Sequence, residues 1–449
     1  MIKNVEELKN NLQNVVEVDG WQKVKVSNAE KLRSSVIDTL VYESVFNPSE
    51  EVKTKTRWLI HELARSLGAG SASIQGLYSA YGRGEVSGFT VPAVNIRGIT
   101  YDFARAMFRV AKKNNIGPFV FEIAKSEMGY TDQRPSVYSA CVLAAAVKEN
   151  FSGPVFIQGD HFQFNAKKFA QDPRKETDVI KSLIKEAIEA EFYNIDIDSS
   201  TLVDLAKGTT EEQQRNNFEL AAEMTALIRE VEPKGVTVSV GGEIGEVGGK
   251  NSTPEEFRAY MEGYMKTLNS KKHGATPISK ISVQTGSSHG GVPLPDGTVA
   301  QVKIDFGVLE SISKIARTEY AMAGAVQHGA STLPEGLFDK FPGVGTAEIH
   351  LATGFQNLLY DIFPKDFRDT IYDYLRKNCA DEKKPNETDE QFIYKTRKKA
   401  FGPFKQQMWN LGKDWFAKAN VELENRFEFL FLKLKTQNTK NTVNKYVKI

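Results

Sequence analysis

The sequence predicts an α/β protein built around a (β/α)8 barrel, a TIM barrel, with helical extensions at both ends. Between Phe89 and Asp361, short apolar runs alternate with amphipathic stretches such as "DVIKSLIKEAIEAEF", in which apolar residues recur at helical spacing. Such alternation is typical of βα units around a parallel sheet. Eight runs fall within about 270 residues, close to the ~250 residues of a closed barrel, so we prefer the barrel to a doubly wound open sheet.

The eight apolar runs supply the expected strands in chain order. They are "FTVPAVNI" (89–96), "GPFVFEIA" (117–124), "GPVFIQGD" (153–160), "NIDIDSS" (194–200), "VTVSVGGEIG" (236–245), "PISKISVQTG" (277–286), "AMAGAVQHG" (321–329) and "GTAEIHLA" (345–352). In a barrel of this kind the reactive side chains sit at the carboxyl ends of the strands. Those ends are therefore the places to search for a site.

The flanking segments define two extensions of the barrel. Residues 1–88 form a mostly helical N-terminal extension that includes "TRWLIHELARSL", and its glycine cluster "GAGSASIQG" is interpreted as a loop. Residues 89–361 form the catalytic barrel. Residues 362–449 form a helical C-terminal extension, whose aromatic stripe we expect to pack against the barrel or another subunit, with its lysines facing solvent.

Composition excludes several classes of protein. The 449 residues hold 58 Lys+Arg and 57 Asp+Glu, so the net charge of +1 favours neither nucleic acid nor an anionic membrane as a partner. Two cysteines provide no disulfide framework. The first residues, "MIKNVEELKNNLQ", lack the apolar core of a signal peptide, and no run of ~18 apolar residues occurs. We expect a cytoplasmic protein without a membrane span.

Reactive side chains follow five of the predicted strands. They are Asp160 and His161 after the third, Asp196, Asp198 and Ser199 after the fourth, Glu243 after the fifth, His289 after the sixth and His328 after the seventh. Three imidazoles on a rigid ring suit a divalent transition metal with an open position; zinc fits best, and cobalt, manganese or iron fit the same ligand types. Asp160, beside a predicted ligand, is the candidate general acid/base.

Two histidines are each followed by glycine and small residues, in "HGGV" and "HGAST". Such turns expose backbone N–H groups and admit a phosphate closely, so they predict a phosphorylated substrate. The segment "GGEIGEVGGKN" lacks the spacing of a dinucleotide loop. We interpret it instead as a mobile loop over the site, with Glu243 directed toward the metal region.

These residues resemble the class II, metal-dependent fructose-bisphosphate aldolase family over about 89–361. The resemblance implies zinc ligands His161, His289 and His328, with Glu243 at an alternative or second metal position and Asp160 as catalytic acid/base. It also implies substrate or phosphate contacts at Asn95, Ser126, Gly290, Gly329, Ser331 and Thr353. In the family, the metal stabilises the ene-diolate of dihydroxyacetone phosphate, and the aspartate exchanges the hydroxyl proton at the bond that breaks.

Several positions depart from the family pattern. The mobile loop carries Lys250-Asn251-Ser252 in place of an acidic pair, so Glu246 or Glu255 would have to carry the second proton. His350 replaces an asparagine on the last strand, an acidic residue near Gly354 is missing, and Pro293 stands at a common lysine position. These departures bear on substrate identity more than on metal chemistry.

The resulting hypothesis is a zinc-dependent, homo-oligomeric (dimeric or tetrameric) aldolase that cleaves fructose 1,6-bisphosphate to dihydroxyacetone phosphate and glyceraldehyde 3-phosphate. Tagatose bisphosphate or another phosphorylated ketose is the close alternative. Three further alternatives stay open: a Schiff-base aldolase using Lys280, a metal hydrolase, and a non-catalytic relative. The hydrolase is disfavoured because "FTVPAVNI" lacks a His-x-His pair.

Overall fold

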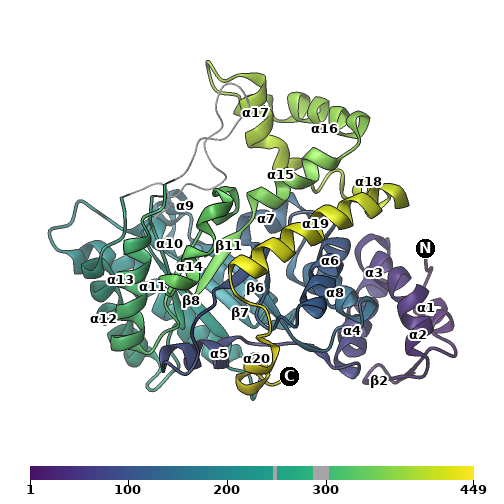
Figure 1. Ribbon diagram of the computed structural model, residues 1–449, viewed down its shortest axis with the longest axis horizontal. Helices are drawn as coiled ribbons and strands as arrows, with labels where there is room; N and C mark the ends of the chain where they lie inside the picture. Colours follow the sequence, from purple (N-terminus) through teal and green to yellow (C-terminus); the bar gives the residue numbers. More distant parts are fainter. Residues whose placement is uncertain (246–249, 287–302) are drawn as a thin grey trace.

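The computed structural model describes residues 1–245, 250–286 and 303–449 (Figure 1). Eight parallel strands follow the order β6-β5-β4-β11-β10-β9-β8-β7, and pairing of β6 with β7 closes the barrel. The strands are β4 (Val91–Asn95), β5 (Val120–Ala124), β6 (Gly153–Gln163), β7 (Asn194–Asp198), β8 (Ser239–Ile244), β9 (Lys280–Val283), β10 (Ala325–Gln327) and β11 (Glu348–Leu351). Seven of them lie within the predicted runs, and β6 begins with its run and continues three residues past it to Gln163, so the predicted barrel is confirmed.

The barrel strands are buried along their length, which explains their short, nearly continuous apolar runs. All five residues of β5 and all five of β7 are buried, as expected when helices cover the outside of a parallel sheet and side chains fill the inside. Buried polar side chains interrupt this pattern in the barrel interior, among them Glu122, Gln158, Lys280 and Glu348. These four lie at or beneath the site described below.

Helices surround the barrel as the amphipathic stretches predict. They include α6 (Thr100–Lys113), α7 (Lys125–Tyr130), α8 (Pro135–Lys148), α9 (Ala166–Gln171), α10 (Pro173–Glu189), α11 (Thr210–Val231), α12 (Pro254–Lys271), α13 (Phe306–Tyr320), α14 (Lys340–Gly343) and α15 (Thr353–Ile362). The "STPEEF" segment begins α12: the Thr253 hydroxyl accepts from the Glu256 N–H while the Glu256 carboxylate accepts from the Thr253 N–H. This capping box satisfies two donors at the helix start.

The N-terminal segment packs onto the barrel's helical layer. It contains α1 (Val5–Asn11), β1 (Val16–Asp19), β2 (Lys23–Val26), α2 (Ala29–Lys31), a π-helical turn (Leu32–Val36), α3 (Ile37–Phe46), α4 (Glu50–Ser66), β3 (Ala69–Ser71) and α5 (Gln75–Gly82). Helices α3 and α4 contact α8. Because α8 is therefore covered on two sides, it is apolar nearly all round, with every residue from Val137 to Val147 buried.

The glycine cluster after α4 is partly a strand, which corrects the predicted loop. Ala69–Ser71 forms β3 and pairs in parallel with the start of β6. Gly70 is needed there because a Cβ at this position would lie 2.3 Å from Cγ2 of Ile449. Ile449 therefore packs against this strand, and the glycine allows this close approach.

The C-terminal segment returns across the barrel (Figure 1). It contains α16 (Lys365–Asn378), α17 (Asp389–Thr396), a 3-10 turn η6 (Arg397–Ala400), α18 (Lys405–Trp409), α19 (Lys413–Lys433) and α20 (Lys440–Tyr446). The expected aromatic packing is present, since Phe427 of α19 meets Phe103 of α6 with ring centroids 5.3 Å apart. Among the described residues, none of the helices is long and apolar enough to cross a membrane.

Candidate metal and catalytic site

A bulge in β6 places Asp160 and His161 at the mouth of the barrel. The β6–β7 register runs through Gln158 and Gly159, breaks, and resumes at Phe162. Adjacent residues of a regular strand point to opposite faces, but a bulge redirects the chain. His161 accordingly has a positive φ of 42°, a conformation that a non-glycine residue adopts at a cost of about 1–3 kcal/mol.

The residue before this pair must be small. A Cβ on Gly159 would lie 2.4 Å from Cε1 of the Phe162 ring, which is fully buried beneath the bulge. The segment "QGDHFQ" therefore folds with its phenylalanine inward and its aspartate and histidine both lining the cavity.

Carboxylates on the next two strands orient the His161 ring. Its Nδ1 lies 2.8 Å from Oδ2 of Asp198 and 3.3 Å from Oε2 of Glu243. Carboxylate contacts of this kind fix the orientation of a metal-binding imidazole and raise its basicity. Glu243 therefore lies beside His161, one of the predicted metal ligands, and Asp198 is an orienting partner that the sequence alone did not assign.

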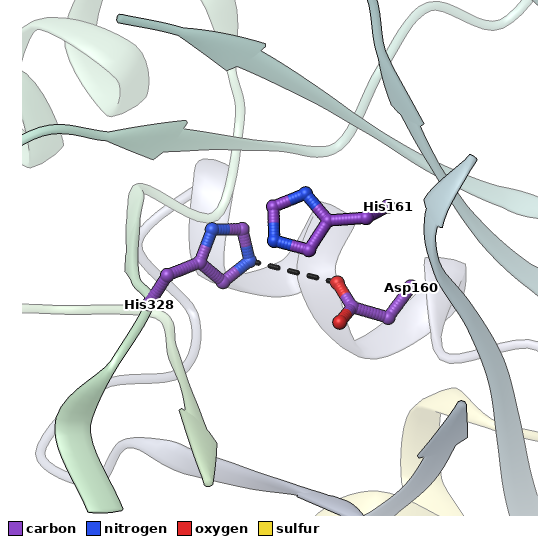
Figure 2. Close-up of side chains that lie close together, drawn as sticks. All are labelled: Asp160, His161 and His328. Atoms are coloured by element: carbon purple, nitrogen blue, oxygen red, sulfur yellow. Dashed lines mark ion pairs between the residues drawn. The ribbon is translucent and has the colours of Figure 1, made fainter. Parts of the chain in front are cut away.

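His328 reaches the same point from β10, across the barrel mouth (Figure 2). Its ring centroid lies 4.3 Å from that of His161, and its Nε2 lies 3.6 Å from Oδ1 of Asp160. Its Nδ1 is 3.8 Å from Oε1 of Glu243. Two of the three predicted histidine ligands and both predicted carboxylates thus meet at one place.

A third histidine, His350 on β11, completes the described cluster. Its Nδ1 lies 3.2 Å from Oδ1 of Asp160 and 3.1 Å from Oε2 of Glu122. Its Nε2 lies 2.7 Å from Oε1 of Glu348. The residue noted in the sequence only as a departure from the family pattern is therefore in direct contact with the candidate acid/base.

A buried ion cluster forms the floor beneath these groups. Lys280 is 1 % exposed; its Nζ lies 2.9 Å from Oδ2 of Asp196 and donates to Oε1 of Gln158 at 2.8 Å and to Glu348. Gly241 leaves room for this cluster, because a Cβ there would lie 2.3 Å from Oδ1 of Asp196. Lys280 does not line the cavity, which disfavours a Schiff base at this residue.

The charges around the site set distinct protonation states. Burial alone would raise the pKa of Asp160, but His161, His350 and His328 together lower that pKa well below its ordinary value. Burial lowers the pKa of Lys280, yet Asp196 and Glu348 outweigh it and hold the pKa above its ordinary value. The candidate base is therefore a carboxylate and the floor lysine an ammonium, which suit proton abstraction and charge compensation respectively.

The site opens into a cavity of about 410 Å³. All the predicted substrate contacts that lie within the described residues line this cavity: Asn95, Ser126, Gly329, Ser331 and Thr353. The Asn95 Oδ1 is buried and, within the described part of the chain, accepts no hydrogen bond. The Ser331 Oγ accepts from the N–H of Gly354 at 2.9 Å, which ties the β10 and β11 loops together beside His328.

Several predicted residues fall elsewhere. His289, Gly290, Pro293 and Glu246 lie outside the described residues. Glu255 is exposed in the first turn of α12 and does not line the cavity, so its suggested proton-carrying role is not favoured. Ser199 is buried and donates to the backbone of Asn217, which gives it a structural contact away from the cavity.

Other cavity residues were missed in the sequence. Arg97 and Lys398 line the site, and Lys398 comes from η6 in the C-terminal segment, whose lysines were expected to face solvent. Glu122 and Glu348 reach the cluster from "FVFEIA" and "AEIHLA". A lone carboxylate within an apolar barrel strand was the available signal, because such a group must find a buried partner.

The donor set fits a divalent metal. One group of ligand atoms from Asp160, His161 and His328 lies within 4.8 Å of one another, and a second group joins His161 to Asp198 and Glu243. Mixed imidazole and carboxylate ligands suit zinc and other first-row divalent ions. His161 belongs to both groups, and His328 and Glu243 each join it in one of them.

The chain is similar to known proteins in sequence and in fold. Residues 80–419 match the family model "Fructose-bisphosphate aldolase class-II". No match was found among curated proteins. The fold is similar to that of a probable tagatose 6-phosphate kinase from Sinorhizobium meliloti 1021, with a TM-score of 0.55 and 16% identity over 79% of this chain and 93% of the other.

Two further solved structures are similar. A fructuronate-tagaturonate epimerase from Cohnella laeviribosi has a TM-score of 0.51 and 11% identity over 91% of this chain and 90% of that one. A fructose-bisphosphate aldolase from Campylobacter jejuni has a TM-score of 0.49 and 18% identity over 83% and 96%. The family model spans well over half of the sequence, so the chain belongs to the class II fructose-bisphosphate aldolase family.

Proposed function

We propose that the protein is a divalent-metal-dependent aldolase that reversibly cleaves a ketose bisphosphate, with fructose 1,6-bisphosphate as the leading substrate and dihydroxyacetone phosphate and glyceraldehyde 3-phosphate as products. Tagatose bisphosphate or another phosphorylated ketose is the alternative substrate. The observation that carries the proposal is the adjacency of Asp160 to His161 and His328, which puts a charged base beside a metal-ligand set. Zinc is the proposed ion.

A divalent metal, when bound, supplies Lewis-acid stabilisation of the negative charge that develops as the carbon–carbon bond breaks. Asp160 accepts the proton of the substrate hydroxyl on the carbon that becomes the aldehyde, and returns it in the reverse direction. His350 holds the Asp160 carboxylate through the 3.2 Å contact of Nδ1 with Oδ1. Gly329, Ser331 and Thr353 bind the phosphate next to the carbonyl.

The test combines metal analysis with a screen of ketose phosphates for aldehyde release. Asp160→Ala should abolish cleavage while the protein still binds zinc, because the neighbouring imidazoles remain. His328→Ala should lose both zinc and activity. Wild-type turnover retained by Asp160→Ala would remove this residue from the mechanism, and full zinc occupancy in His328→Ala would remove that histidine from the ligand set.

A further inference from the structure

We propose that the C-terminal segment supplies the residue that selects the substrate's distal end: Lys398 binds an oxyanion at the end of the ketose remote from the carbonyl. This inference rests on the proposed function, because it assumes that a sugar lies in the cavity over Asp160. Lys398 lines the same cavity as Asp160, His161 and His328, although it is far from them in the sequence.

The cations that line the cavity differ in what they contact. Arg97 Nε lies 2.7 Å from Oε1 of Glu127, and Lys125 Nζ lies 3.1 Å from Oε1 of Glu176. Lys398 and Lys168 form no ion pair with any residue in the described ranges, and of these two Lys168 is exposed whereas Lys398 is partly buried. Arg97 and Lys125 are therefore already compensated, whereas the partly buried ammonium of Lys398 is available to an incoming anion.

The surroundings of Lys398 favour an anionic partner. Its Nζ lies 5.9 Å from the Tyr130 ring centroid, and the side chain is partly buried. Burial and the nearby Arg97 guanidinium lower the pKa of Lys398. The charged form of Lys398 is thus destabilised by burial and by repulsion from Arg97. An oxyanion bound between the two cations would offset that repulsion.

The backbone that carries Lys398 is fixed against the barrel. Arg397 lies over the rings of Tyr360 and Tyr394, with its guanidinium carbon 4.9 Å and 4.5 Å from the two centroids. Four residues past Lys398, Gly402 donates its N–H to the Tyr130 carbonyl at 3.0 Å, and a Cβ at Gly402 would lie 2.5 Å from that oxygen. The lysine is therefore held on a rigid wall of the cavity.

The same cavity is lined by the predicted phosphate contacts Gly329, Ser331 and Thr353. A ketose whose carbonyl end is bound by these residues can place its far end beside Arg97 and Lys398. The distal group is a phosphate or a carboxylate, because both present charged oxygens to a lysine and a guanidinium. The proposed substrate class is thus a ketose with a terminal oxyanion.

Measuring the binding of three sugars shows whether the distal group is a phosphate or a carboxylate. Calorimetry would use zinc-loaded, full-length Asp160→Ala protein, which should not turn over, with fructose 1,6-bisphosphate, fructose 1-phosphate and fructuronate. Lys398→Met, added to this variant, should weaken the binding of one of the two distally charged sugars at least about tenfold, as expected for loss of a charge-assisted contact. The binding of fructose 1-phosphate, which has no distal charge, is the reference for this change. The sugar affected identifies phosphate or carboxylate.

Two matched variants separate charge from folding. Lys398→Arg should retain the preference for the distal anion. Lys399→Met should also retain it, because Lys399 pairs with Glu382 and does not line the cavity. A preference for both distally charged sugars that stays within twofold in Lys398→Met would overturn the inference.

The outcome for catalysis is read separately on the wild-type chain. Lys398-dependent binding without cleavage would support the distal-anion site and refute the aldolase. Cleavage by a protein whose sugar binding does not depend on Lys398 would support the aldolase and refute the distal-anion site. Failure of the Asp160→Ala protein and the wild-type protein to bind any of the three sugars would refute both.

Discussion

Replacing Lys280 by methionine should destabilise the protein far more than an average substitution. Its ammonium has three donors and meets three acceptors, on Asp196, Gln158 and Glu348, at a position that is 1 % exposed. Methionine fills the space but removes the ammonium from the two buried carboxylates of Asp196 and Glu348, which keep the His350 imidazole beside them. Breaking a buried pair in this way costs about 3–5 kcal/mol, against about 1 kcal/mol for a typical mutation.

The loss of stability in Lys280→Met should be larger at high pH than at low pH. Burial raises the pKa of Asp196 from 3.8 to about 6, although Lys280 opposes this shift. A carboxyl whose folded pKa lies above its unfolded value stabilises the protein at low pH and loses that contribution as pH rises through the window between the two. Without Lys280 the folded pKa rises further, so the variant's deficit should be larger at pH 8 than at pH 5.5.

Urea denaturation followed by circular dichroism at both pH values measures this deficit. Lys266→Met, at an exposed position of α12, is the matched control and should stay within about 0.5 kcal/mol of wild type. Adding Glu348→Gln to Lys280→Met should recover part of the loss, because it removes one uncompensated charge. A deficit below about 1 kcal/mol at pH 8, or one that does not change with pH, would refute the assigned role.

Three further results are expected. Burial raises the pKa of the Cys141 thiol to about 12, so this thiol should react with Ellman's reagent only after unfolding; rapid labelling of the native protein would contradict its burial. Gly241→Ala should cost about 1–3 kcal/mol in urea denaturation, because its Cβ would lie 2.3 Å from Asp196 Oδ1; Gly343→Ala, with nothing within 4 Å, is the control, and equal stability of the two would count against the packing. Adding zinc should raise the melting temperature of metal-free wild type but not of His328→Ala, since binding stabilises only the folded state; an equal rise would exclude His328 as a ligand.

The barrel was predictable because its strands are short apolar runs with helical stretches between them. The mouth residues Asp160, His161, Glu243 and His328 were predictable for a related reason: polar groups that end buried strands of a barrel converge. Contacts between segments that are far apart in the sequence were not predictable. The position of Lys398 depends on how η6 docks against α7, and no local pattern around "RKKAFG" encodes that contact.

The role of His350 escaped sequence reasoning for a different reason. Comparison with a family pattern marked it only as a substitution for asparagine. Its effect depends on where Glu122 and Asp160 lie around it, and those distances follow from barrel closure rather than from neighbouring residues. A departure from a motif can therefore add a contact at a site as readily as it removes one.

The β6 bulge has a consequence for how the site can change over time. Consecutive Cα atoms are held ~3.8 Å apart by covalent geometry, so the separation of Asp160 from His161 does not depend on the packing of any loop. Every other pair at the mouth joins different strands and moves with them. Insertions in the surrounding loops can alter which sugar enters, while the base and its neighbouring ligand stay tethered to each other.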